Sequence, residues 1–143
     1  MAVELDHAFS TSRTIDESFA TILDLDRVIP CVEGGKVLER TGPESAKAEI
    51  YVKMGAMGLK FIGTVDVVEQ DPAAHRVVLG VKSREAGGQG HANGTITFQL
   101  NDGGGTIHTH AQITGKAASM GEGVVSGVLD AMIKDFSVKL GAL

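Results

Sequence analysis

The chain has 143 residues, of which 43% are hydrophobic and 22% are charged, a composition that predicts one ordinary globular domain over residues 1–143. Its formal net charge of −5 and the lack of a Lys/Arg stripe argue against nucleic acid as a partner. A lone cysteine, charges in the first ten residues and no apolar run near the ~20 residues that span a bilayer favour a cytoplasmic protein with only peripheral membrane contact.

The N-terminal part combines one strand with short helices. Residues 2–11 alternate between apolar and polar side chains, which predicts a half-buried strand. Thr14 and Glu17 have the spacing of a capping box, so we expect a short helix to begin there. A second helical turn should follow before Pro30, and the helical excursion should end near residue 33.

From Lys36 onward the pattern has a period of two and predicts a run of about six antiparallel strands. Turn signals separate them at Gly42-Pro43, 55–58, Asp71-Pro72, Gly87-Gly88 and 101–105. The glycine-rich segments lie between strands rather than before a helix, so we interpret them as hairpin turns and not as phosphate loops. The alternation gives one dry face, with these side chains: Ala48, Ile50, Val52, Met54, Leu59, Phe61, Val65, Val67, Val77, Leu79, Val81, Ile96, Phe98, Leu100, Ile107, Ala111 and Ile113.

The segment from about Ser119 to the C-terminus predicts a long helix with one apolar arc, formed by Val125, Leu129, Met132, Ile133, Phe136 and Leu140. Burying this arc on the dry face of the strands predicts an α+β fold, in which a curved antiparallel sheet of about seven strands wraps around the C-terminal helix. Only 4% of the residues are aromatic and none is Trp, so such a sheet encloses a cavity unless other side chains fill it.

Several short segments occur in a family-like order along the chain: 28–34 (VIPCVEG), 61–65 (FIGTV), 88–90 (GQG) before 94–96 (GTI), and 115–121 (GKAASMG) leading to Phe136. With these segments the chain resembles the carbon monoxide dehydrogenase CoxG family, within the START/polyketide-cyclase-like (SRPBCC), helix-grip superfamily. The resemblance covers nearly the whole chain. It implies the helix-grip fold and a cavity that holds apolar molecules.

The resemblance also implies a function. It indicates a non-catalytic accessory protein that serves the molybdenum-containing carbon monoxide dehydrogenase at the inner face of the cytoplasmic membrane. Its ligand would be an isoprenoid quinone such as menaquinone, held without a covalent bond. Two alternatives remain: an assembly or docking factor with a solid core, and a cyclase or hydrolase that uses the same cavity.

The expected ligand site lies between the helix and the sheet. A closed core is the alternative for the same apolar residues, and the resemblance favours the cavity. The candidate wall comprises Val52, Met54, Met57, Leu59, Phe61, Leu79, Val81, Phe98, Val125, Leu129, Met132, Ile133 and Phe136. The candidate portal comprises Gly55, Met57 and Gly58 at an apolar hairpin tip, together with Gly123 and Gly127 of the helix. The alternative for Met54 and Met57 is that they tuck under the start of the helix.

Few polar side chains suggest chemistry. His108 and His110 share a strand face with metal-ligand spacing, but that face is wet and no third ligand stands out, so we expect two solvated histidines and no metal site. His7 falls on the dry face of the first strand, as a satisfied core histidine or a hydrogen-bond partner of a quinone carbonyl. Cys31 lacks a partner or base and is expected to be a small buried side chain, so no catalytic residue is predicted.

Overall fold

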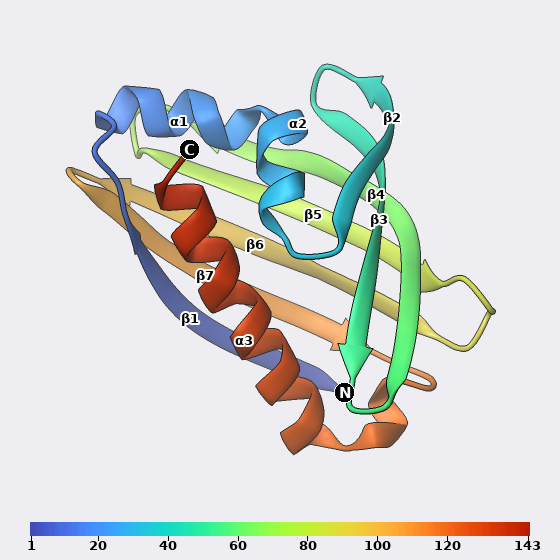
Figure 1. Cartoon of the computed structure of the whole chain (residues 1–143). Coiled ribbons are helices and arrows are strands. Elements are labelled where there is room, and N and C mark those ends of the chain that lie inside the picture. The colour runs from blue at the N-terminus through green and yellow to red at the C-terminus, as the bar shows by residue number, and fades with distance from the viewer.

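Seven strands form one antiparallel sheet in the computed structural model, which describes all 143 residues (Figure 1). The strands pair in the order β1-β7-β6-β5-β4-β3-β2, so consecutive strands from β2 to β7 are neighbours and β1 closes against β7. This topology confirms the predicted meander. The strand bounds are β1 Ala2–Ser10, β2 Gly35–Gly42, β3 Ser45–Met54, β4 Met57–Asp71, β5 Arg76–Glu85, β6 His91–Asn101 and β7 Gly104–Ile113.

The helices occur where the sequence predicts them. They are α1 Ile15–Leu23, α2 Leu25–Val28 and α3 Glu122–Gly141, with single 3-10 turns at η1 Ile29–Cys31 and η2 Ala118–Met120. The capping box of α1 is present, because the Glu17 N–H donates to the Thr14 hydroxyl at 3.2 Å and the Thr14 N–H donates to the Glu17 carboxylate at 3.0 Å. The Thr14 N–H also lowers the pKa of Glu17, since it favours the charged carboxylate.

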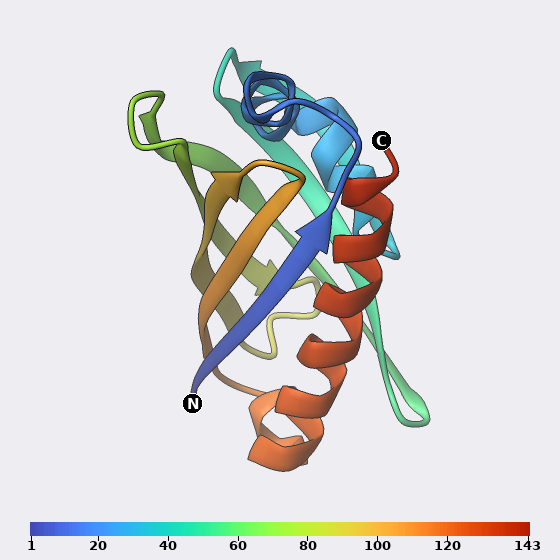
Figure 2. The same cartoon turned by 90° about the vertical axis from the view of Figure 1, so that its left-hand side faces the viewer.

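The sheet curves around α3, which runs along its concave face while α1 and α2 lie at one end (Figure 1 and Figure 2). Two glycines on the concave side mark close approaches between strands. A Cβ at Gly63 would overlap the backbone oxygen of Lys82, and a Cβ at Gly94 would overlap that of His110. A register shift between Val67 and Glu69 adds a bulge to the β4–β5 pair. Such close approaches and bulges increase sheet twist and curvature.

The apolar core consists of two clusters rather than one. The first lies at the end covered by α1, α2 and the last turns of α3, where the rings of Phe98 and Phe136 have centroids 6.2 Å apart. The second lies at the opposite end, around Met54, Phe61 and Val125. The core is therefore packed at both ends of α3.

Candidate ligand cavity

A cavity of about 270 Å³ lies between the concave face of the sheet and α3, and residues of both core clusters line it. It is partly open to solvent, and 24 of its 34 lining residues are hydrophobic. The sequence left a closed core and a cavity as alternatives for these apolar residues, and the structure contains the cavity.

The hollow arises where small residues meet across neighbouring strands. In one row of the sheet Ala48 pairs with Gly63, Gly63 with Ser83, and Ser83 with Ala92. In the next row Gly94 pairs with Ala111. Strand alternation directs this whole set towards α3, and all six residues line the cavity. The sheet therefore lacks bulky side chains in its middle, where the helix passes over it.

Most of the predicted wall residues line this cavity. Eleven of the thirteen do so: Val52, Met54, Phe61, Leu79, Val81, Phe98, Val125, Leu129, Met132, Ile133 and Phe136. Met57 and Leu59 do not, so their assignment to the wall is wrong. Leu59 is buried in the second core cluster, and Met57 packs against that cluster from the hairpin tip. Both lie beyond the end of the cavity.

The candidate portal residues separate into two groups. Gly55 and Gly58 lie at the exposed tip between β3 and β4, and Met57 packs in the same cluster as Val125 near the start of α3. Gly123 and Gly127 are exposed, a Cβ at either meets no atom within 4 Å, and neither lines the cavity. At 100° per residue both lie on the side of α3 opposite Val125. The expectation that these two glycines open a path to the cavity is therefore wrong.

Thr109 is a lining residue that the sequence analysis missed. Its position on β7 lies between Ile107 and Ala111 on the inward face, its side chain is buried at 7% exposure, and its hydroxyl has no hydrogen-bond partner. The other inward polar side chain of the wall, Ser83, donates to the carbonyl oxygen of Ala92 at 2.5 Å. The signal was available in the alternation of β7, which places Thr109 among apolar neighbours.

His7 does not line the cavity. Its Nε2 lies 2.8 Å from a carboxylate oxygen of Asp130, so this contact joins β1 to α3, and its Nδ1 is buried without a partner. Lys134 and then His7 lower the pKa of Asp130, because both contacts favour the charged carboxylate. The hypothesis that His7 reaches a quinone carbonyl is therefore wrong for this cavity.

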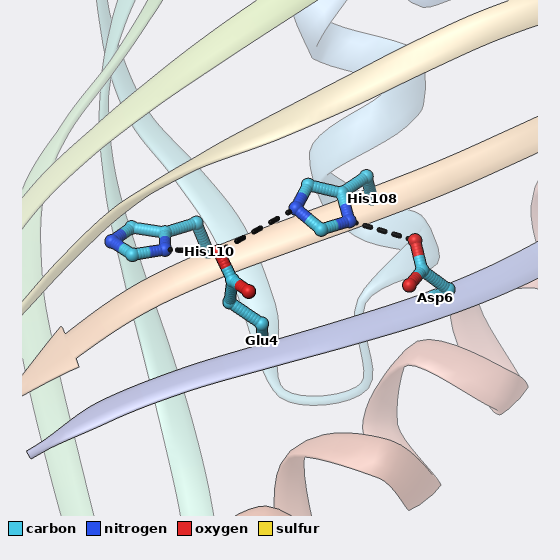
Figure 3. Close-up of polar contacts among 4 residues, drawn as sticks. All are labelled: Glu4, Asp6, His108 and His110. Carbon is cyan, nitrogen blue, oxygen red and sulfur yellow. Dashed lines mark hydrogen bonds and ion pairs between the residues drawn. The ribbon is translucent and has the colours of Figure 1, made fainter.

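The two histidines of the convex face are paired with carboxylates of the neighbouring strand (Figure 3). His108 Nδ1 lies 2.7 Å from Asp6, and His110 Nδ1 lies 3.0 Å from Glu4. The sequence analysis did not identify these acidic partners. The structure contains no group of three or more His, Cys, Asp or Glu side chains placed to hold a metal ion.

Cys31 is buried, as expected, and its thiol lies 3.4 Å from the carbonyl oxygen of Arg27. Burial raises the pKa of the Cys31 thiol. The thiol therefore stays protonated at neutral pH and is a weak nucleophile.

A family model described as carbon monoxide dehydrogenase CoxG matches residues 8–141. The chain belongs to the CoxG family. No curated protein matches it. Solved structures with the same fold include a conserved protein from Geobacillus kaustophilus, which has 22% identity and a TM-score of 0.79 over 99% of this chain and 93% of that one.

Two further neighbours place this CoxG family member among helix-grip proteins. A START superfamily protein from Mycobacterium smegmatis has 11% identity and a TM-score of 0.58 over 99% of this chain and 94% of that one. The Zhui aromatase/cyclase from a Streptomyces species has 17% identity and a TM-score of 0.52 over 97% and 88%. The helix-grip fold expected from the sequence is thereby confirmed. None of the helices of this family member is long and apolar enough to cross a bilayer.

Proposed function

We propose that this protein is a non-catalytic carrier that binds a respiratory quinone, such as menaquinone, between its sheet and α3, and serves carbon monoxide dehydrogenase. One observation supports the ligand class above all: the cavity wall is apolar over 24 of 34 residues, and only two of its inward side chains, Ser83 and Thr109, are polar. Such a wall fits a ring or prenyl chain and gives little purchase to a charged molecule. The family supports the choice of partner.

The size of the cavity indicates which part of a quinone enters. About 270 Å³ is close to the lower end of the ~300–1,000 Å³ that small-molecule sites occupy. A quinone ring that loses about 200 Å² of apolar surface to the cavity would gain about 5 kcal/mol before the cost of immobilisation. We therefore assign the ring and the first isoprene units to the cavity and the rest of the chain to its open side.

The tip between β3 and β4 is our candidate for peripheral contact with the membrane. It carries Ala56 and Met57 between exposed glycines, and Val124 at the start of α3 is 44% exposed. Lys53 and Lys60 lie on the two strands close to this tip and are exposed. An apolar tip with flanking lysines suits insertion between anionic lipid headgroups. In this proposal the quinone leaves the bilayer next to the tip.

The wall offers no acid–base pair for catalysis. Ser83 is already bonded to a backbone carbonyl, and His7 lies outside the cavity. The likeness to an aromatase/cyclase rests on fold at 17% identity and transfers no activity. The carrier hypothesis therefore needs no reacting group in the cavity.

The test is to purify the protein from a host that makes menaquinone, record its native mass spectrum, and identify any small molecule released by organic solvent. We expect a bound quinone at close to one equivalent. A protein that is empty and also fails to bind added menaquinone would refute the carrier function and favour a docking or assembly role. Purification of a variant with a filled cavity, Ala111→Leu, provides the matched control.

A further inference from the structure

Thr109 is the one unpaired polar side chain on the cavity wall. Its hydroxyl is buried with no hydrogen-bond partner, and the other buried polar atoms without partners belong to residues outside the lining. Its neighbours across the sheet are Leu5 on β1 and Ile96 on β6, both apolar. A buried hydroxyl without a partner destabilises a protein, so native structures seldom keep one without a use.

Packing alone does not explain the residue. Two other buried hydroxyl groups follow the usual pattern, since Thr21 and Ser137 donate to the carbonyl oxygens of the preceding helical turn at 2.8 and 2.7 Å. Valine has nearly the same shape as threonine and would fill this position without an unpaired oxygen. The hydroxyl of Thr109 therefore lacks the partner that the folded chain gives to comparable groups.

We propose that Thr109 anchors the ligand, by a hydrogen bond between its hydroxyl and one oxygen of an otherwise apolar molecule. This inference rests on the proposed carrier function and adds the residue that sets ligand orientation and specificity. On the neighbouring inward positions, Ala111 follows along β7 and Gly94 lies on β6, so space for a ring is adjacent to the hydroxyl.

The chemistry of a hydroxyl suits both redox forms of a quinone. It donates a hydrogen bond to the carbonyl oxygen of the oxidised form and accepts one from the hydroxyl of the reduced form. A charged anchor would favour one of the two forms. Thr109 thus allows the carrier to hold the ligand before and after it receives electrons, with no proton transfer to the protein.

The experiment compares the wild type with Thr109→Val, which removes the hydroxyl, and Thr109→Ser, which keeps it. The probes are menadione, which has two ring carbonyls, and 2-methylnaphthalene, which has the related ring system without oxygen. We expect Thr109→Val to weaken menadione binding about fivefold, the factor that corresponds to a hydrogen bond of about 1 kcal/mol, and Thr109→Ser to stay closer to the wild type. The three proteins should bind 2-methylnaphthalene equally.

Two further measurements separate an anchor from a structural residue. The infrared carbonyl stretch of bound menadione should lie at lower wavenumber in the wild type than in Thr109→Val, because a hydrogen bond weakens the C=O bond. Without ligand, Thr109→Val should melt at a higher temperature than the wild type, because it no longer buries an unpaired hydroxyl.

The outcomes distinguish this inference from the proposed function. Equal menadione affinity for the wild type and Thr109→Val would overturn the role of Thr109 while leaving a quinone-binding cavity in place. Weaker binding of both probes by Thr109→Val would overturn it as well, since the hydrocarbon has no oxygen to bond. A wild-type protein that binds neither menadione, menaquinone nor the hydrocarbon would overturn the carrier function itself.

Discussion

Filling the cavity with Ala111→Leu should stabilise the protein and prevent ligand binding at the same time. Ala111 lies on the cavity wall and faces Gly94 across the strands, so a larger side chain has room. The change adds three carbons, worth about 2.4 kcal/mol at ~0.8 kcal/mol for each buried carbon. Ordering the leucine side chain costs about 0.5–1 kcal/mol, which leaves about 1.5 kcal/mol of net stabilisation. A chain of this length should then melt about 5 °C higher.

The assay is thermal unfolding with and without menadione. At a concentration a hundredfold above its Kd, the ligand stabilises a binding-competent protein by about 2.7 kcal/mol, and this shift should be absent in Ala111→Leu. Ala131→Leu adds the same three carbons on an exposed position of α3 outside the cavity lining, so it should keep the ligand-induced shift. Destabilised Ala111→Leu that still responds to menadione would refute our account of the cavity.

Gly127→Leu should leave menadione affinity unchanged in titration calorimetry, because Gly127 faces away from the cavity. Thr14→Ala should lower the free energy of unfolding by about 1 kcal/mol in urea, through loss of the α1 cap. Glu17 has a lowered pKa, so its contribution to stability is present above its ordinary value of 4.5 and is lost as the pH falls; Glu17→Gln should therefore flatten the acid limb of the stability curve. Cys31 has a raised pKa, so its contribution is lost as the pH rises above about 9, and a thiol reagent should label it only after denaturant is added; labelling of the native protein would contradict its burial.

Local signals in the sequence were sufficient for the fold. A capping box, a period of two with regular turn signals, and one apolar arc on the last helix each report on nearby residues. Together they allow only a few ways to bury their apolar faces, and a sheet wrapped around the helix is one of them. The strand pairing followed because antiparallel neighbours in sequence are usually neighbours in space.

The candidate site was less accessible to this reasoning. The period of two assigns Leu59 correctly to the dry face but does not say how far along the strand the cavity ends. Gly127 was misplaced although the helical period itself puts it about 200° from Val125, on the opposite side. Thr109 was missed because a polar residue inside an apolar alternation was not counted as inward. The small residues that create the hollow were visible, but only strand register brings Gly63 next to Ser83 and Gly94 next to Ala111.

The row of small residues also divides the cavity wall into a fixed and an adjustable part. Gly63 and Gly94 admit no side chain, because backbone oxygens of the adjacent strands occupy the space of a Cβ. Ala48, Ala92 and Ala111 already carry a Cβ and line the same space, so larger residues there shorten the cavity without moving a strand. Family members that differ at these alanine positions should therefore select ligands of different bulk on one unchanged backbone, and the same positions are the ones to vary when the protein is redesigned for another apolar cargo.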